Sequence, residues 1–406
     1  MEAVADLGID AGFVAEARAF LDGHARRLPD PSSLAWGEGS DELGGEGVES
    51  TEAERAWYES AQDWRRTEFD AGFGWLVGPK EYGGRELPVT AERLYRTLKD
   101  EYDLPRDPFT ISLGMVAPAI LRHGMQEVRD RYLRGLHRGD LLGCQMFSEP
   151  GAGSDLASVS TRAVRDGDEW VLNGQKVWTS LAHLADIGEV LCRTDPSGSK
   201  HRGLTAFVLD MTAPGVEVRP LKQMNGGHAF NEVFLTDVRI PDSHRLGEVD
   251  RGWVVAISTL MGERALGVGR DLFGVQEATR RLIQAARELG DPHDQLLRQN
   301  VAACWVEAQV IKLNGMLSED RWRRGFPPGP AESITKISNT EAMRKIAAVA
   351  TELIGPSMVA DTGAWGTAAW GDYVMHTAGC RIAAGTDEIM RNILAERVLG
   401  LPKDAA

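Results

Sequence analysis

The spacing of apolar residues changes twice along this chain, and these two changes constrain its fold more than any other feature. Up to about residue 140, apolar side chains recur at the spacing of amphipathic helices, as in residues 9–30 and 51–71. From Gly143 the pattern alternates with a period of two, and from Arg251 the helical spacing returns. The pattern predicts an α+β fold with an N-terminal all-α domain (residues 1–140), a middle antiparallel β domain (141–247) and a C-terminal α-helical bundle (248–406).

Individual elements follow from the same patterns. In the N-terminal part we expect further helices at residues 89–103, 108–123 and 127–138. In the middle part, Asn173-Gly174 predicts a hairpin turn inside residues 169–178, and we expect further strands at 204–211, 216–221 and 232–240. In the C-terminal part, the pattern predicts long helices at 253–289, 294–324 and 332–354, and a last one at 386–399.

Composition excludes several classes of protein. The 406 residues carry a formal net charge of −15, which argues against nucleic acid as a partner. The four cysteines have neither the spacing of a metal site nor that of a disulfide framework, so we expect a reduced, cytoplasmic setting and no bound metal. The acidic N-terminus lacks a signal pattern, and no apolar run approaches the ~18 residues that cross a bilayer. The sequence therefore predicts a soluble protein without a membrane span.

The stretch Gly143–Asp155, GCQMFSEPGAGSD, joins the first helical region to the alternating region. Ser148, Ser154 and the backbone N–H groups near its glycines offer many hydrogen-bond donors. Glycine also lets a backbone approach a flat or anionic ligand closely. Judged by its Gly, Ser and Pro content alone, however, the stretch is a surface turn.

Two further motifs change that interpretation. The sequence KVWTS occupies 176–180, and GTDEI occupies 385–389 at the start of the last predicted helix. Together with SEPGAGSD (148–155), FNEVFLTDVRIPDSHRLG (230–247) and VGPKEYGG (77–84), these motifs resemble the acyl-CoA dehydrogenase family over nearly the whole chain. The resemblance is to bacterial members that act on branched or steroid side-chain acyl-CoAs.

The resemblance implies FAD as cofactor. Gln145, Phe147 and Ser148 match residues that meet the pyrimidine side of the flavin, and Ser154 matches a serine at the substrate thioester arm. In the second motif, Trp178 matches the tryptophan that covers the ring, and Ser180 matches a hydroxyl residue near N5; Thr179 between them belongs to the same cofactor-binding set. A flavin needs such donors at its polar edge and an aromatic cover. Without its neighbours, Trp178 would instead be interpreted as a core aromatic residue.

The third motif matches the nucleotide end of the cofactor. Gly385 and Thr386 begin a helix, whose N-terminus favours phosphate oxygens, and Glu388 belongs to the same motif. Gln299 matches a glutamine that reaches FAD across a subunit interface, and Glu352 stands where the family has the glutamine of Gln-x-x-Gly-Gly. Arg287-Glu-Leu-Gly290 is a shortened form of Arg-x-x-Phe-Gly. These departures leave open whether both elements still bind FAD, and they add a heteromer of two related chains as an alternative to a homomer.

The residue that removes the substrate proton is displaced relative to much of the family. A glutamate usually precedes the Gly-Thr of the third motif, but here Ala384 stands there. Glu263-Arg264, on the first helix of the C-terminal bundle, matches the Glu-Arg of isovaleryl-type enzymes, which implies Glu263 as the base. The alternative is a structural ion pair of Glu263 with Arg264 or Arg270. The implied substrate-binding residues are Ser154, Met261, Arg264, Ala384 and Gly385, with the Ala384 N–H available to polarise the thioester carbonyl.

The resemblance thus implies α,β-dehydrogenation of an acyl-CoA, with the α proton passing to Glu263 and the β hydride to FAD N5. The small side chains of Ala383 and Ala384 favour a branched or bulky acyl group. We expect an electron-transfer flavoprotein as electron acceptor, and a homotetramer or a heterotetramer with a related chain. Two alternatives remain at this point: a flavin-dependent oxidase or monooxygenase on the same fold, and a non-catalytic partner subunit.

Overall fold

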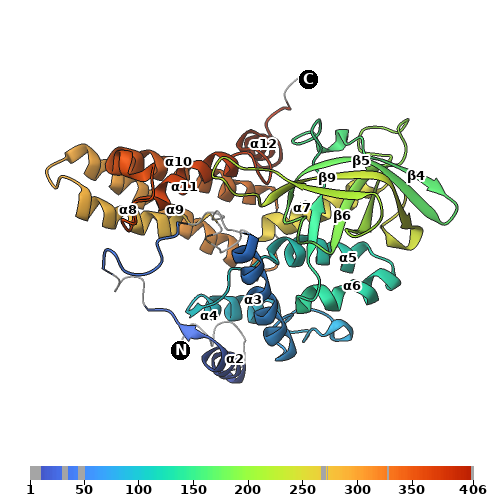
Figure 1. Ribbon diagram of the computed structural model, residues 1–406, viewed down its shortest axis with the longest axis horizontal. Coiled ribbons are helices and arrows are strands. Elements are labelled where there is room, and N and C mark those ends of the chain that lie inside the picture. Colours follow the sequence, from blue (N-terminus) through green and yellow to red (C-terminus); the bar gives the residue numbers. More distant parts are fainter. Residues whose placement is uncertain are drawn as a thin grey trace. The chain divides into compact units, whose positions relative to one another are not determined.

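The computed structural model describes residues 11–29, 35–43, 51–266, 271, 273–326 and 329–403 (Figure 1). The chain forms two compact units. Unit 1 comprises residues 1–31, 49–222 and 228–262, and unit 2 comprises residues 32–48, 223–227 and 263–406. The predicted α+β fold is confirmed, whereas the predicted division into three domains at 140 and 247 stays a prediction. None of the helices in the described ranges combines the length and the apolar character needed to cross a lipid bilayer.

The N-terminal helices of unit 1 lie close to their predicted positions. They are α2 (Ala11–His24), α3 (Thr51–Asp70), α4 (Val89–Lys99), a π-helical turn (Ser112–Val116) that leads into α5 (Ala117–His123), and α6 (Gln126–Arg138). Residues 9, 10 and 30 of the first predicted helix lie outside the described residues. The helix predicted to reach residue 103 ends at Lys99, because Tyr102–Asp103 (β2) pairs with Arg26–Arg27 (β1).

Unit 1 also contains one large sheet, whose strand order is β10-β7-β6-β4-β5-β9-β8, with β3 paired to β6. Its strands are β3 (Gly143–Met146), β4 (Arg162–Asp166), β5 (Glu169–Ser180), β6 (Ile187–Arg193), β7 (Leu204–Asp210), β8 (Val216–Pro220), β9 (Phe230–Pro241) and β10 (Arg245–Leu246). Most neighbours are antiparallel, as predicted, but β3 runs parallel to β6 and β4 meets β6 in parallel. The sheet is therefore mixed, and β3 delivers the chain into the loop after Met146.

The hairpin predicted at Asn173-Gly174 is wrong. The chain turns at Gly167-Asp168, so that Asp166 pairs with Glu169, and β5 then runs unbroken through Asn173-Gly174. The register of β5 against β9 shifts at this point, which marks a bulge. The Asn173 side chain donates to Asp237 Oδ1 (2.9 Å) and accepts from Asp237 N (3.0 Å), so it stabilises the bulge instead of a turn. A Cβ on Gly174 would lie 2.7 Å from Thr161 Cα, which explains the glycine.

Unit 2 is helical, as predicted for the C-terminal part. Its helices are α8 (Val275–Leu289), α9 (Gln295–Arg323), α10 (Ser333–Ile354), α11 (Ala369–Cys380) and α12 (Asp387–Ile393), which continues as a π-helical turn (Leu394–Val398). The single helix predicted at 253–289 is wrong: α7 (Gly252–Leu266) and α8 are separate helices. Asp271 accepts from Val275 N and Gln276 N, each at 2.8 Å, and Gly274 has a left-handed φ of 64°, so a new helix begins there.

A buried carboxyl group connects the sheet to α7 within unit 1. Glu189 is fully buried on β6, between Ile187 and Leu191 on the face that packs into the largest apolar core. Thr259 of α7 donates to Glu189 Oε1 at 2.7 Å, whereas Oε2 is buried without a partner in the described part of the chain. Burial raises the pKa of Glu189 to about 8. The carboxyl group is therefore mostly protonated at neutral pH.

Glu189 makes the stability of the fold depend on pH. A carboxyl whose pKa is about 8 in the folded chain and ~4.3 in the unfolded chain binds more protons when folded, so the free energy of unfolding falls as pH rises between these values. We expect Glu189→Gln to keep the Thr259 hydrogen bond and to lose this fall, measured by urea unfolding between about pH 5 and pH 8. The exposed Glu59→Gln is the control, and an unchanged slope in Glu189→Gln would contradict the assignment.

Candidate active site

The loop after β3 is fixed by a buried ion pair between Glu149 and Lys176. Lys176 is fully buried on β5, and its Nζ lies 2.8 Å from Glu149 Oε1. The same ammonium donates to Phe147 O (3.1 Å) and to Leu191 O (2.6 Å), so each of its three N–H groups has an acceptor. Lys176 thereby holds the loop against both β5 and β6.

Both carboxylate oxygens of Glu149 also accept hydrogen bonds. Its Oε2 accepts from Ser160 N (2.7 Å) and Ser160 Oγ (2.8 Å), and its Oε1 accepts from Thr161 N (2.8 Å) as well as from Lys176. Burial alone would raise the pKa of Glu149, but the Lys176 charge and these hydrogen bonds outweigh it and lower the pKa to about 2. A buried ion pair is stable only when its remaining donors and acceptors are satisfied, and this pair meets that condition.

The end of β5 carries a second bulge, which turns Trp178 outward. The register against β9 shifts between Lys176 and Thr179, and Val177 N donates to Ser148 O at 2.9 Å. Trp178 has a φ of 60°, which is rare for an aromatic residue, and its side chain is 61% exposed. Its ring meets the Phe230 ring edge-on at 6.1 Å. Trp178 is thus not a core residue: a strained backbone holds an aromatic plate on the surface, and such strain is typical of functional sites.

The other predicted residues of the first two motifs lie near Trp178 in the sequence and in the sheet. Ser148 and Ser180 are half-buried and Ser154 is exposed, and their hydroxyl groups form no hydrogen bond within the described ranges. Gln145 Nε2 and Thr179 Oγ1 are buried without a partner there. Gln145 is half-buried, and its register partner on β6 is Glu189. An outward aromatic plate beside free hydroxyl groups fits a flat cofactor with a polar edge.

The third motif is held in unit 2 by Asp387. This carboxylate is fully buried and accepts from Lys336 Nζ (2.7 Å), Thr340 Oγ1 (2.9 Å) and Arg381 Nε (2.9 Å). Burial raises its pKa, but these donors outweigh that effect and lower it. Thr386 caps α12 by accepting from Ile389 N at 3.2 Å.

The turn before α12 has an unusual backbone. Ala384 and Gly385 both have positive φ, 56° and 84° respectively. Ala384 is exposed, and its N–H donates to no acceptor in the described part of the chain. A Cβ at Gly385 would clash with Met390 Cε. The Asp387 network therefore holds a narrow turn with a free backbone donor at the position where much of the family has its base.

Three predicted cofactor residues lie on the surface of unit 2. Gln299 on α9, Glu352 on α10 and Glu388 on α12 are exposed. Arg287 and Gly290, the two ends of the shortened element, line a pocket between α8 and α9 together with Arg298. The structure leaves these residues free to meet another molecule, and their cofactor roles stay predictions.

Glu263 lies in the last turn of α7, next to Met261 and Arg264. All three residues are half-buried. Burial raises the pKa of Glu263 to about 7 despite the opposing charge of Arg264. The Glu263 carboxyl forms no hydrogen bond or ion pair with any described residue, and Arg270, the other arginine considered as its partner, lies outside the described residues. Its neighbour Gly262, the last residue of unit 1, packs so closely on Gly114 that a Cβ would clash with the Gly114 carbonyl.

Sequence reasoning missed the groups that hold the motifs in place. On β5, Lys176 faces the same side of the sheet as the buried Trp170 and Leu172. Glu189 is an ionisable residue within the otherwise apolar strand β6. A charge at an inward position of a strand signals a buried partner, and that signal was present in the alternating pattern. Asp387 lies beside the predicted Thr386 and Glu388 but has a structural role that spacing alone does not reveal.

Removing the Lys176 ammonium tests its role in the loop. We expect Lys176→Met to lower the free energy of unfolding by ~3–5 kcal/mol, because Glu149 would remain buried without its counter-charge. We also expect loss of bound flavin, because the loop through Ser148 loses its anchor. Urea unfolding and the flavin absorbance of the purified variant measure both effects. Lys200→Met, which removes an exposed ion pair with Asp155, is the control, and equal effects of the two substitutions would contradict the assignment.

Comparisons with known proteins place this geometry in a family. The model of the acyl-CoA dehydrogenase middle domain matches residues 144–238, and that of the acyl-CoA dehydrogenase C-terminal domain matches residues 250–399. The chain is 34% identical to acyl-CoA dehydrogenase IpdE1 of Mycobacterium tuberculosis over 374 residues, which cover 89% of this chain and 92% of that protein.

Solved structures of acyl-CoA dehydrogenases have the same fold. The structure of the Tcur3481-Tcur3483 steroid ACAD covers 98% of this chain and 100% of its own, with a TM-score of 0.77 and 26% identity. The ChsE4-ChsE5 complex from Mycobacterium tuberculosis covers 98% of this chain and 99% of its own, with a TM-score of 0.75 and 26% identity. The protein therefore belongs to the acyl-CoA dehydrogenase family of flavoproteins, oxidoreductases that act on CH–CH donors.

Proposed function

We propose that this protein is an FAD-dependent dehydrogenase in which Glu263 removes the α proton of a branched or bulky acyl-CoA, and that its electrons pass to an electron-transfer flavoprotein. The observation that carries the proposal is the state of Glu263. It is a half-buried carboxyl without an ion pair in the described ranges, with its pKa raised to about 7. A general base is most effective when its pKa lies near the working pH.

The lack of an acidic side chain at Ala384 also supports Glu263 as the base. A methyl group cannot accept a proton, so the position that serves as base in much of the family is excluded here. The Ala384 N–H has no acceptor within the described part of the chain, and so it is available to donate to a thioester carbonyl. Such a donor stabilises the negative charge that develops on the carbonyl oxygen as Glu263 takes the proton.

The chain's contribution to cofactor binding follows from the anchored loop. Phe147, Ser148, Trp178, Thr179 and Ser180 would hold the flavin ring, since Lys176 and the second bulge fix their backbone. Thr386 would receive a phosphate at the N-terminus of α12. When bound, FAD supplies the acceptor for the β hydride.

The acyl group is inferred from the turn that replaces the usual base. Ala383 and Ala384 are both exposed, and each carries only a methyl group. Their short side chains leave room that a larger pair of residues would fill, which favours a branched or ring-bearing acyl chain over a plain linear one. The steroid acyl-CoA dehydrogenase among the similar structures supports this choice.

Anaerobic addition of a panel of acyl-CoAs to the purified flavoprotein tests the proposal. We expect branched or ring-bearing acyl-CoAs to bleach the flavin absorbance, because Glu263 can accept the α proton at neutral pH. In Glu263→Gln we expect bleaching to slow by ~10²–10⁴-fold, the usual contribution of a general base, with flavin content unchanged. Stopped-flow absorbance measures the rate.

Glu288→Gln, an exposed carboxylate on α8, is the control and should reduce at the native rate. Unchanged bleaching in Glu263→Gln would remove Glu263 as the base. A much faster reaction with a linear medium-chain acyl-CoA than with any branched one would contradict the substrate class. Rapid reoxidation of the reduced protein by O2 would favour an oxidase instead, and a colourless purified protein would favour a partner subunit.

An exposed apolar stripe on α9 supports assembly with a second copy or a related chain. The side chains of Val306, Val310, Leu313 and Leu317 follow helical spacing and are each at least half exposed. Water disfavours such a contiguous patch, which is typical of protein–protein interfaces. We expect a tetrameric mass in sedimentation, and a smaller mass for Leu313→Lys combined with Leu317→Lys. A monomeric native protein would contradict assembly with a second copy.

A further inference from the structure

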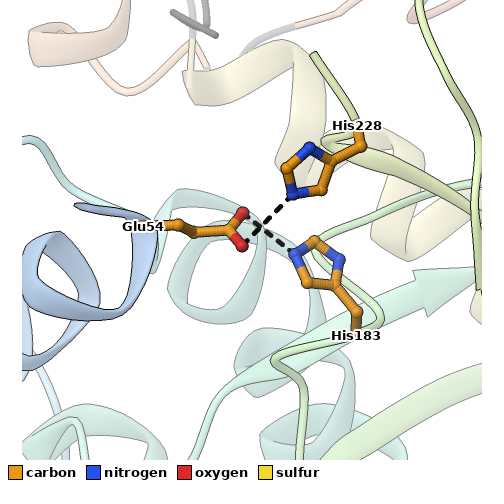
Figure 2. A group of neighbouring side chains, drawn as sticks. All are labelled: Glu54, His183 and His228. Carbon is orange, nitrogen blue, oxygen red and sulfur yellow. Dashed lines mark hydrogen bonds and ion pairs between the residues drawn. The ribbon is translucent and has the colours of Figure 1, made fainter. Parts of the chain in front are cut away.

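Three side chains from separate segments of unit 1 converge beside the second bulge. Glu54 lies in the first turn of α3, His183 lies just after β5, and His228 lies just before β9. Figure 2 shows the Glu54 carboxylate facing the two imidazole rings, which lie next to each other. His183 Nε2 is 3.0 Å from Glu54 Oε1, and His228 Nε2 is 3.3 Å from Glu54 Oε2. One ligating atom from each residue lies within 4.8 Å of the others.

The hydrogen bonds of Asn231 decide where the proton of His183 lies. Asn231 Nδ2 donates to Thr179 O at 3.0 Å and faces Ala229 O at 3.4 Å, so its Oδ1 is an acceptor. His183 Nδ1 lies 3.1 Å from that Oδ1 and must donate to it. In a neutral ring this leaves the lone pair of Nε2 facing a carboxylate oxygen. Two acceptors at 3.0 Å require a positive centre between them, either a proton or a metal ion.

The arrangement has the features of a metal site. Bonds of ~2.0–2.1 Å around a tetrahedral Zn²⁺ place neighbouring ligand atoms ~3.3 Å apart. The two carboxylate–imidazole distances, 3.0 and 3.3 Å, are close to this value, and all three ligand atoms lie within 4.8 Å of one another. Two imidazoles and one carboxylate are a known three-ligand zinc set that leaves a fourth position for water. Metal-binding histidines almost always donate their other N–H to a fixed acceptor, and Asn231 gives His183 that acceptor. The ligand side chains are largely buried, with exposed fractions of 13%, 15% and 31%.

We propose that Glu54, His183 and His228 bind a divalent transition-metal ion of the zinc class, with water as the fourth ligand. The nitrogen ligands exclude Mg²⁺ and Ca²⁺, which prefer all-oxygen sites. The ion joins α3 to the end of β5 and the start of β9. His183 follows Ser180 by three positions, and Asn231 holds the Thr179 carbonyl, so the ion stiffens the segment that carries Trp178. This role is structural and does not depend on the proposed reaction.

Metal titration of the purified flavoprotein, stripped with a chelator, tests the proposal. We expect one equivalent of Zn²⁺ to bind in calorimetry and to raise the melting temperature, since a ligand that binds only the folded state stabilises it. Co²⁺ should give the intense visible absorbance of a tetrahedral site, and Mg²⁺ should not bind. We expect Glu54→Gln and the double variant His183→Ala, His228→Ala to lose at least 100-fold in affinity. Asn231→Ala should lose ~10–100-fold.

Glu52→Gln, on the same helix turn but exposed, and the exposed His293→Ala are the matched controls and should bind as the native chain does. Circular dichroism verifies that each variant is folded. If the double histidine variant does not fold, Glu54→Gln still tests the site, because glutamine keeps the shape of the native side chain. Absence of Zn²⁺ and Co²⁺ binding by the native chain, or equal binding by the native chain and Glu54→Gln, would overturn the proposal. The cluster would then be a proton-bridged hydrogen-bond network only.

Discussion

The Glu149–Lys176 pair is the interaction on which the candidate site depends. A fully buried ammonium is costly unless every donor is satisfied, and Lys176 meets this condition by joining Glu149, Phe147 and Leu191. These contacts bring the loop after β3, the end of β5 and strand β6 to one point. The outward Trp178 and the free hydroxyl groups of Ser148 and Ser180 follow from that geometry. The pair does no chemistry itself, but it decides where the chemistry can occur.

The proposed base has the opposite electrostatic environment. Glu149 has its pKa lowered to about 2 by its partners, whereas Glu263 has its pKa raised to about 7 because burial outweighs the opposing charge of Arg264. One carboxylate is therefore permanently charged and structural, and the other can take and release a proton at neutral pH. Glu189 on β6, which accepts a hydrogen bond from Thr259 of α7, is a third case: burial raises its pKa to about 8 and so keeps it mostly protonated at neutral pH. The three carboxyl groups thus differ in environment, and this difference supports the proposed role of Glu263 as the base.

The sequence predicted the architecture well because long periodic segments decide it. The α+β class, the helices α3, α6, α9 and α10 and the strands β7, β8 and β9 were predicted from apolar spacing alone, whereas β3, β4, β6 and β10 were not predicted. Local signals were less reliable: Asn173-Gly174 forms a bulge because its side chain pairs with Asp237, and the long helix at 253–289 divides because Asp271 caps α8. The outward position of Trp178 depends on a register shift that single-sequence patterns do not encode. Glu54, His183 and His228 are too far apart in sequence for spacing to connect them.

The central claim is that Glu263 takes the substrate proton, and the pH dependence of flavin reduction tests it most directly. The second-order rate constant for anaerobic reduction reports the ionisation of the free protein. A base with a pKa of about 7 is charged only above that value, so the rate constant should rise with pH and level off above about pH 7. In Glu263→Asp the midpoint should move with the new carboxyl group. A pH-independent rate constant, or a midpoint unchanged in Glu263→Asp, would contradict the account.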